Sequence, residues 1–384
     1  MAETNDVVEN ERQVATRKPD APATNGRTDE ATPTELDFRA SRIDFLDYEA
    51  GAGGERRQSL RGFEDHYTDI IDYIVRCTHR MWEEGGVGLL YEYYSHNAVV
   101  WSDWGQSYGR DQTIEYVVQR MAGFPNLRIY ANDVIWAGDD VQGFRTCHRI
   151  TQTGHNWGYS KYGPPTNRPT QSTCFANCVM RENRIYEEWL VVDEMTVVRQ
   201  LGLDPDAVLR GIAGGVLPPN IDIVGESVKA RGQGRPDTYV PRNPDQPDVE
   251  DFLRSNLHEL WNWRMLNRIS DLYAPNCVIH APSGRELYGL GDAKALVVAL
   301  MASFPDARFE VDDLYWNGDE RMGYRTAVRW SLTGTHRGVG IWGKPTGRPV
   351  HIIGTTSHII RDGKIVEEWT LFNELALLWK LHYA

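Results

Sequence analysis

The spacing of apolar and polar residues follows the same course twice along the chain. Apolar positions recur every three or four residues over 64–94 and 249–273, which predicts helices. The segments "RDQTIEYVVQRMAGF" (110–124) and "LGDAKALVVALMASF" (290–304) predict a shorter helix that ends before a proline. Alternating apolar residues then predict strands, which in the first half cover residues 127–137, 141–153, 170–181 and 184–193. Helices followed by an antiparallel sheet are typical of an α+β domain.

The two halves of the chain are also similar in sequence. Residues 124–194 align with residues 304–374 without a gap, and 25 of the 71 positions are identical. Unrelated sequences of ordinary composition would share about four or five positions, so the pattern indicates a duplication. We therefore expect two domains, called repeat one (residues 60–205) and repeat two (residues 249–384).

The segments outside the repeats have a different composition. Residues 1–40 are polar and rich in charge, which predicts a disordered tail, and residues 206–248 have the proline, glycine and charge content of a linker. The amino terminus lacks the apolar core of a signal peptide, and no run of 18 apolar residues occurs. The expectation is a cytoplasmic protein without a membrane span.

Charge and cysteine content narrow the choice of partners. The 41 basic and 54 acidic residues give a net charge of −13, which disfavours nucleic acid and anionic membranes as partners. The five cysteines do not have the spacing of a disulfide framework, which favours a reducing compartment. Cys174 and Cys178 lie four residues apart on a predicted strand, about 13 Å, which is too far for one zinc ion. We expect no metal site.

Three motifs in repeat two resemble a known family. They are "FPDARFEVDDLYWNGDE", "GTHRGVGIWGKPTGRPV" and "RDGKIVEEW", and they are similar to the SnoaL-like polyketide cyclases, which have the nuclear transport factor two-like fold. The resemblance extends over both repeats. It implies two tandem cone-shaped α+β domains, each with N-terminal helices packed on a curved antiparallel sheet and a ligand pocket in its mouth. It also implies acid–base chemistry without a metal or organic cofactor. The fold hosts many reactions and also binding modules, so it does not choose the activity.

The resemblance implies a catalytic acid near the end of the last strand, in a Trp-x-x-x-Asp arrangement. Trp189 and Asp193 meet this arrangement, whereas repeat two has Trp369 and Asn373. Trp189 and Asp193 share one face of the strand, which predicts a lined pocket. Burial there would raise the pKa of the carboxyl and suit it to act as a general base. Alternatively, Asp193 ends the strand in solvent or pairs with an arginine.

Four further residues are candidates for proton transfer or ligand binding, and a fifth for the pocket wall. His358, on an apolar strand face, either moves a proton or is a core histidine. His280 and Trp101 occupy the first strand of their repeats, which borders the pocket in this fold, and Asp103 is a second acid on the same face as Trp101. His336 lies beside a loop rich in glycine and proline, which acts as a lid or fixes a crossover.

Two arginines per repeat share a strand face because they are spaced by four residues. They are Arg145 and Arg149 in repeat one and Arg325 and Arg329 in repeat two. They could bind an anion, but we favour structural ion pairs with the glutamates at 187–188 and 367–368 on the adjacent last strand.

These observations leave three functional hypotheses. The first is an enzyme that acts on a small hydrophobic carbonyl compound by aldol-type cyclisation, isomerisation or hydration and dehydration, with Asp193, Asp103, His280 and His358 as catalytic candidates. Its substrate would be bound by Trp101, Trp189, Trp369, Asn373 and His336. The alternative is a non-catalytic small-molecule-binding or assembly module. In the third, one repeat is catalytic and the other structural. In each hypothesis, we expect the two repeats to form an intramolecular pseudo-dimer. Whether the chain also forms a homo-oligomer is left open by the sequence.

Overall fold

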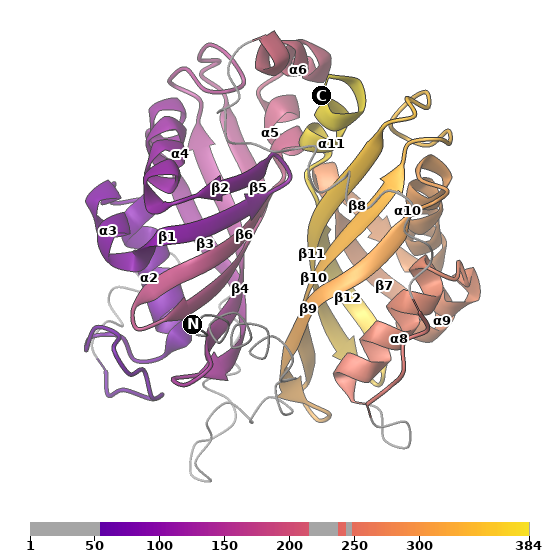
Figure 1. Ribbon diagram of the computed structural model, residues 1–384, viewed down its shortest axis with the longest axis horizontal. Coiled ribbons are helices and arrows are strands. Elements are labelled where there is room, and N and C mark those ends of the chain that lie inside the picture. The colour runs from indigo at the N-terminus through magenta and orange to yellow at the C-terminus, as the bar shows by residue number, and fades with distance from the viewer. Residues whose placement is uncertain (1–53, 215–236, 243–247, 384) are drawn as a thin grey trace, which may run out of the picture.

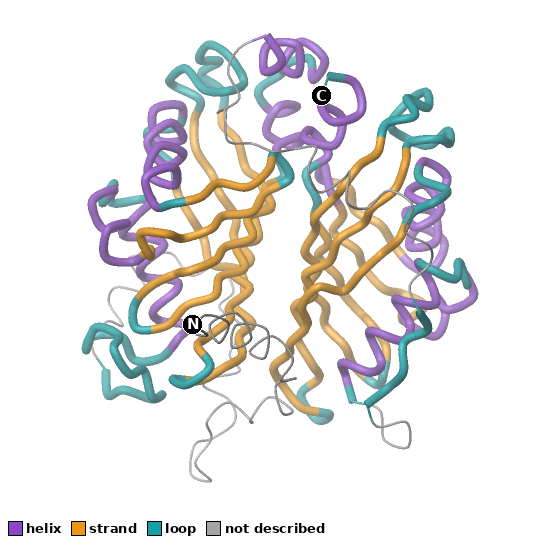
Figure 2. The backbone as a smooth tube through the Cα atoms, in the orientation of Figure 1, coloured by secondary structure: helices purple, strands orange, loops and turns teal. Residues whose placement is uncertain are grey.

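The computed structural model describes residues 54–214, 237–242 and 248–383, and within them it contains two six-stranded sheets (Figure 1). The tail expected at 1–40 lies outside the described residues, as do 215–236 and 243–247 of the expected linker. Helices cover one face of each sheet, and the other two faces lie toward each other (Figure 2). The predicted pair of α+β domains is confirmed. None of the described helices is long and apolar enough to cross a membrane.

Repeat one begins with helices and continues with the sheet. Its helices are α2 (Ile70–Trp82), the 3-10 turn η2 (Val87–Leu89), α3 (Leu90–Tyr93), α4 (Arg110–Gly123) and, after the sheet, α5 (Glu194–Gln200) and α6 (Pro205–Gly214). Its strands are β1 (Tyr94–Ser102), β2 (Gly105–Tyr108), β3 (Arg128–Asp139), β4 (Gly143–His155), β5 (Pro169–Arg181) and β6 (Arg184–Val192). Their order is β2-β1-β6-β5-β4-β3.

Repeat two has the same arrangement. Its helices are α8 (Val249–Trp261), η3 (Leu266–Arg268), α9 (Ile269–Leu272), η4 (Pro282–Gly284), α10 (Gly289–Ser303) and α11 (Glu374–His382). Its strands are β7 (Tyr273–Ala281), β8 (Arg285–Tyr288), β9 (Arg308–Asp319), β10 (Gly323–Thr335), β11 (Pro349–Arg361) and β12 (Lys364–Leu371), in the order β8-β7-β12-β11-β10-β9. Neighbouring strands are antiparallel, except that β1 is parallel to β6 and β7 is parallel to β12. The sequence predicted purely antiparallel sheets, and this part of the prediction is wrong.

Both repeats contain the sequence Trp-x-Gly-Asp, at residues 136–139 and 316–319, and its glycine has a steric basis. Gly138 and Gly318 both have positive φ, 103° and 98°. A Cβ atom at either position would lie 2.1 or 2.2 Å from the carbonyl oxygen of Gly143 or Gly323 on the next strand. Only glycine fits such a conformation and approach, so the duplicated motif records a backbone constraint at the end of β3 and β9.

The uncovered faces of the two sheets form a shared apolar layer. It consists of the buried residues Ile135, Ala137, Cys147, Phe175, Val191, Tyr315, Ala327 and Leu371, with Trp369 packed against them. Asn317 of β9 ties the layer together, since its side chain accepts from the backbone N–H of Trp136 and donates to the carbonyl of Trp136, both at 3.0 Å. Each sheet therefore packs against helices of its own repeat on one face and against the sheet of the other repeat on the other face.

The shared arginines pair across this layer. The Arg145 guanidinium lies 2.5 Å from the Asp313 carboxylate, and the Arg325 guanidinium lies 2.6 Å from the Asp133 carboxylate. The acids stand on β3 and β9 of the opposite repeat, so the predicted pairing with the glutamates of the last strands is wrong. The prediction missed these partners because it considered only strands within one repeat, whereas the arginine faces are turned toward the other one.

The other two shared arginines lie over tryptophan rings of the opposite repeat. Arg149 stands over the ring of Trp369 and Arg329 over the ring of Trp189, both 3.8 Å from the ring centre. Because a guanidinium is attracted to the face of an indole, these contacts stabilise the packing of the two repeats. They also place both tryptophans outside the two cones.

The core of repeat one contains a histidine whose burial should make stability depend on pH. His148 on β4 is 1% exposed, and neither ring nitrogen has a hydrogen-bond partner among the described residues. Burial lowers its pKa to about 3. The unfolded chain, with an ordinary histidine, takes up a proton below about pH 6.5, so stability is lost as pH falls from that value.

We expect His148→Val, which introduces the residue of repeat two at Val328, to remove this dependence. Between pH 7.5 and pH 5, the free energy of unfolding should fall by about 2 kcal/mol less in the variant than in the wild type. Urea unfolding at both pH values measures the difference. An equal fall in both proteins would show that His148 takes up its proton in the folded state.

Candidate functional site

A sizeable cavity lies in repeat one, between the sheet and helices α2 and α4. Its volume is about 340 Å³. Many of the residues in its walls are apolar or aromatic, and they include Trp82, Val100, Tyr116, Leu190 and Val192. Residues of α6 and Asn373 of repeat two complete the wall. The cavity is therefore lined by residues of both repeats. Such a cavity, largely apolar with a few polar groups, suits a small organic ligand.

A buried carboxyl lies in the wall of this cavity. Glu188 on β6 is 7% exposed, and the hydroxyl of Tyr94 donates to its Oε2 at 2.7 Å. Its other oxygen has no hydrogen-bond partner within the described residues. Burial raises the pKa of Glu188, and the hydrogen bond from Tyr94 opposes this. A carboxyl with a raised pKa can accept and release a proton closer to neutral pH than an exposed one.

A second polar group lies at another part of the same wall. Lys161 is ion-paired with Glu194, and the indole Nε1 of Trp104 donates to the other oxygen of Glu194 at 2.8 Å. The Lys161 side chain is 37% exposed, whereas Glu194 is buried. Thr113 also lines the cavity, and its buried hydroxyl has no partner among the described residues. These groups can bind oxygen atoms of a ligand.

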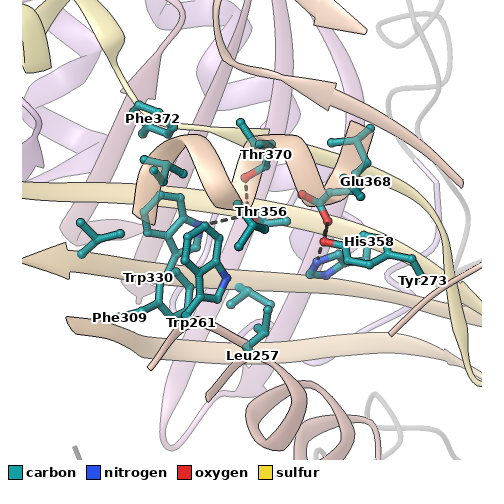
Figure 3. A pocket seen from close by; sticks show the side chains of 17 residues that line it. Leu257, Trp261, Tyr273, Phe309, Trp330, Thr356, His358, Glu368, Thr370 and Phe372 are labelled. Atoms are coloured by element: carbon teal, nitrogen blue, oxygen red, sulfur yellow. Dashed lines mark hydrogen bonds and ion pairs between the residues drawn. The ribbon is translucent and has the colours of Figure 1, made fainter. Parts of the chain in front are cut away.

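The corresponding space in repeat two is mostly filled. Its cavity measures only about 50 Å³ (Figure 3). Three aromatic residues of repeat two replace aliphatic ones of repeat one: Phe309 for Ile129, Trp330 for Ile150 and Phe372 for Val192. All three line the small cavity, and the Trp330 indole donates to Thr356 at 2.9 Å. The larger side chains account for the smaller volume.

The Trp330 indole fits because β11 carries glycine at the contact. A Cβ atom added to Gly354 would lie 2.1 Å from the Trp330 ring. We expect Gly354→Ala to lower the free energy of unfolding by about 1–3 kcal/mol. In a Trp330→Ile background the same change should cost less than half as much, because the ring is gone. Urea unfolding of the four proteins tests this, and an equal cost in both backgrounds would contradict it.

The predicted residue His358 does line the cavity of repeat two. Tyr273 donates to Glu368 at 2.6 Å, and the same glutamate oxygen lies 3.5 Å from Nε2 of His358 (Figure 3). Nδ1 of His358 lies 2.7 Å from the hydroxyl of Thr326. The cluster is nearly inaccessible, since His358 is 2% exposed. In repeat one, Tyr94 and Glu188 form the same pair, and Cys178 replaces the histidine.

Asp193 lines neither of these two cavities. It is the N-cap of α5, and its carboxylate accepts hydrogen bonds from the backbone and hydroxyl of Thr196 at 3.2 and 2.6 Å. It also accepts from the backbone N–H groups of Ser283 and Gly284 in repeat two, both at 3.2 Å. Burial raises its pKa, while the hydrogen bonds oppose this. The carboxylate therefore joins the two repeats.

Asp103 makes the reciprocal contact. Its carboxylate accepts from the backbone N–H groups of Asn373 at 2.9 Å and Ile353 at 3.2 Å, and burial raises its pKa to about 6. Asp103 thus meets the backbone beside Asn373, and Asp193 meets the backbone of the η4 turn, where the hydroxyl of Ser283 also donates to Glu374. An aspartate at position 373 would bring a further carboxylate next to Asp103, which asparagine avoids.

The remaining predicted residues lie away from the two cavities. Trp101 lies between Val100 and Ser102, which line the repeat-one cavity, and strand alternation turns it to the opposite face. His280 stacks on Trp369, with ring centres 4.9 Å apart, and its nitrogens lie near Glu286 and Glu367. Trp189 and Trp369 face the other repeat.

His336 is fully buried outside both cavities. Its ring packs on Phe304, with centres 5.6 Å apart, and its Nδ1 lies 3.3 Å from the hydroxyl of Thr346. Burial lowers its pKa. These contacts fix the chain where the loop before β11 begins. Of the predicted site residues, only Asn373 and His358 line a described cavity, and they line different ones.

The sequence itself relates both repeats to a family. The SnoaL-like polyketide cyclases match residues 72–201 and again residues 252–381, together more than half of the chain. The chain belongs to the SnoaL-like polyketide cyclase family. The search of curated protein sequences gives no match.

Solved structures similar to this SnoaL-like protein each cover about one repeat. A proposed SnoaL-like polyketide cyclase from Jannaschia sp. CCS1 is 19% identical over 37% of this chain and 99% of its own, with a TM-score of 0.32. A proposed polyketide cyclase from Acidithiobacillus ferrooxidans is 25% identical over 35% and 95%, with a TM-score of 0.31. Wild-type IdmH, a proposed polyketide cyclase from Streptomyces antibioticus, is 29% identical over 34% and 96%, with a TM-score of 0.30.

The sequence did not single out the polar groups of the SnoaL-like cavity. Glu188 belongs to the sequence Glu-Glu-Trp, which occurs at 187–189 and again at 367–369, and the sequence favours it only as an ion-pair partner of the shared arginines. Tyr94 and Lys161 carried no motif at all. One signal was present, because Tyr94 and Glu188 have identical counterparts in Tyr273 and Glu368, and a duplicated tyrosine and glutamate on inward strand positions could have indicated a buried pair.

Proposed function

We propose that the cavity of repeat one binds a small hydrophobic carbonyl compound and that Glu188 transfers a proton at the carbon next to the carbonyl. The observation that carries the proposal is the buried carboxyl of Glu188 in the wall of a cavity of about 340 Å³. Membership of the SnoaL-like polyketide cyclase family supports a reaction of this class. Proton abstraction next to a carbonyl is the step common to aldol-type cyclisation and to isomerisation.

Glu188 has the surroundings that this step needs. Its raised pKa brings proton uptake closer to neutral pH, which is where a general base is most effective. Tyr94 fixes one carboxylate oxygen and leaves the other free to accept the proton. The unpartnered hydroxyl of Thr113 is available to donate to a ligand oxygen on which negative charge develops.

Repeat two has a structural role in this proposal. Its own cavity is too small for a ligand of the size that repeat one accommodates. It instead supplies Asn373 to the wall of the repeat-one cavity and covers the outer face of that sheet. The two repeats would then act as an intramolecular pseudo-dimer with one working site.

The proposal can be tested with 2-tetralone, a flat, neutral ketone with exchangeable hydrogens next to its carbonyl. In deuterated buffer, the wild-type protein should accelerate deuterium uptake above the buffer rate, as followed by mass spectrometry. Binding of 2-tetralone, measured by tryptophan fluorescence, is recorded in parallel. Binding without accelerated exchange would contradict catalysis and favour a binding module, which is the alternative function for this fold.

A further inference from the structure

We propose that the amine of Lys161 forms an imine with an aldehyde or ketone group of a ligand in the repeat-one cavity. The inference rests on the proposed function, because it assigns a covalent anchor to the same class of ligand in the same cavity. It adds a substrate feature: an elongated compound with one carbonyl group at Lys161 and a second carbonyl group at Glu188.

The surroundings of Lys161 suit a nucleophilic amine. It lines the cavity, and its ammonium lies 5.1 Å from the ring centre of Trp104 and 5.5 Å from that of Tyr162. Its carboxylate partner Glu194 is buried and is held by the Trp104 indole. Burial lowers the pKa of Lys161, and Glu194 opposes this shift. An apolar, aromatic setting is where lysines become nucleophilic.

The presence of a lysine at position 161, where an arginine would supply the same charge, supports a role in covalent chemistry. Lys161 is the single lysine between residues 54 and 214, a region that otherwise uses arginine for its basic groups. An arginine would bind the Glu194 carboxylate through two parallel hydrogen bonds, but a guanidinium cannot form an imine. The corresponding residue of repeat two, where the cavity is filled, is Ile341. The amine thus occurs only in the repeat with room for a ligand.

The reaction balances with the groups present. Glu194 takes a proton from the Lys161 ammonium, and the nitrogen lone pair forms a bond to the carbonyl carbon. The π electrons of the carbonyl move to its oxygen, which takes up the proton from Glu194 to give a carbinolamine that is protonated on nitrogen. This intermediate loses its hydroxyl group and one nitrogen proton as water, which leaves the protonated imine and the Glu194 carboxylate, and addition of water reverses the reaction. No oxidant, reductant or further reactant is required.

The anchor also defines the length of the ligand. Glu188 and Val192 both line the cavity and lie four residues apart on β6, which corresponds to about 13 Å. Glu194 follows Val192 by two residues and holds the amine at that end of the strand. A ligand bound to Lys161 therefore extends along β6 toward Glu188.

The test uses 2-naphthaldehyde as the probe and sodium cyanoborohydride to reduce any imine to a stable amine at pH 7. Peptide mass spectrometry of the full chain then locates the naphthylmethyl group. We expect Lys161 to be labelled at least about tenfold faster than Lys294 and Lys344, because the cavity can hold the aromatic aldehyde beside the Lys161 amine, whereas the other two lysines line neither cavity. Equal rates at the three lysines would overturn the proposal.

Two variants separate this inference from the proton-transfer role of Glu188. Lys161→Arg keeps the charge opposite Glu194 and should lose the label, with folding checked by circular dichroism and thermal unfolding. Glu188→Gln should be labelled at Lys161 at the wild-type rate, even if it no longer exchanges the hydrogens of 2-tetralone. If wild-type Lys161 is labelled but the protein does not exchange the hydrogens of 2-tetralone, the covalent anchor is supported and proton transfer by Glu188 is contradicted. If the wild type exchanges these hydrogens but Lys161 is not labelled, proton transfer is supported and the anchor is contradicted.

Discussion

Glu188→Gln is expected to slow the exchange of 2-tetralone hydrogens by about 10²–10⁴-fold, the usual contribution of a positioned general base. Glutamine has the same size and can still accept the hydrogen bond from Tyr94, so the cavity should keep its shape. It cannot take up a proton, however, which removes the step itself. The rate is measured by mass spectrometry in deuterated buffer, and 2-tetralone affinity by fluorescence should change little.

The adjacent Glu187 provides a matched control. It precedes Glu188 on β6, points to the opposite side of the strand and is exposed. Glu187→Gln should therefore exchange 2-tetralone at the wild-type rate. If both variants retained that rate, Glu188 would not be the base.

The exchange reaction should also depend on pH in a defined direction. A base works in its deprotonated form, so the rate should rise with pH through the pKa of Glu188, which burial places above the ordinary 4.5. Glu188→Gln should remove this rise. An inflection at or below 4.5 in the wild type would indicate a solvent-exposed carboxyl instead.

The fold could be predicted from local patterns because each element carries its own period. Helical spacing in 110–124 corresponds to α4, and alternation in 170–181 corresponds to β5. Because the two halves are similar in sequence, the same elements could be predicted for the second domain. The parallel pairs β1 with β6 and β7 with β12 could not be predicted in this way. They join strands separated by most of a repeat, and nothing in the local sequence records that contact.

The site was harder to predict because both faces of the strands are buried. Along β6, Trp189 and Val191 alternate with Glu188, Leu190 and Val192, and both sets are apolar enough to line a pocket. In the structure the first set faces the other repeat and the second set faces the cavity. Alternation correctly separated the two sets. It could not say which face lined the cavity, because the second sheet replaces solvent on the outer side.

The carboxylate at the end of β6 shows the same limitation. The contrast between Asp193 and Asn373 is visible in the sequence, but its reason is a contact between repeats that a single strand does not reveal. The cap residue of α5, Asp193, accepts from the backbone of η4 in repeat two, and the backbone of the α11 cap residue, Asn373, donates to Asp103 of repeat one. The two differing residues therefore both lie at contacts between the repeats, and neither is among the catalytic candidates of the two cavities.

Asp193→Ala is therefore expected to destabilise the fold and to leave the chemistry intact. The change removes the cap of α5 and leaves the buried N–H of Ser283 without an acceptor, for a combined loss of about 3 kcal/mol in the free energy of unfolding. Urea unfolding measures this loss. Per folded molecule, exchange of 2-tetralone hydrogens should stay within about twofold of the wild type, since the cavity wall does not include Asp193.

Asp204 separates the capping contribution from the contact between repeats. It accepts a hydrogen bond from the backbone of Ala207 at 3.2 Å at the start of α6, but it is exposed and, within the described residues, has no hydrogen bond or ion pair to repeat two. Asp204→Ala should cost about 1 kcal/mol, as an ordinary cap does. The excess lost in Asp193→Ala then measures the bond between the repeats. Equal losses would refute that bond, and a loss of exchange in fully folded Asp193→Ala would return Asp193 to the reaction itself.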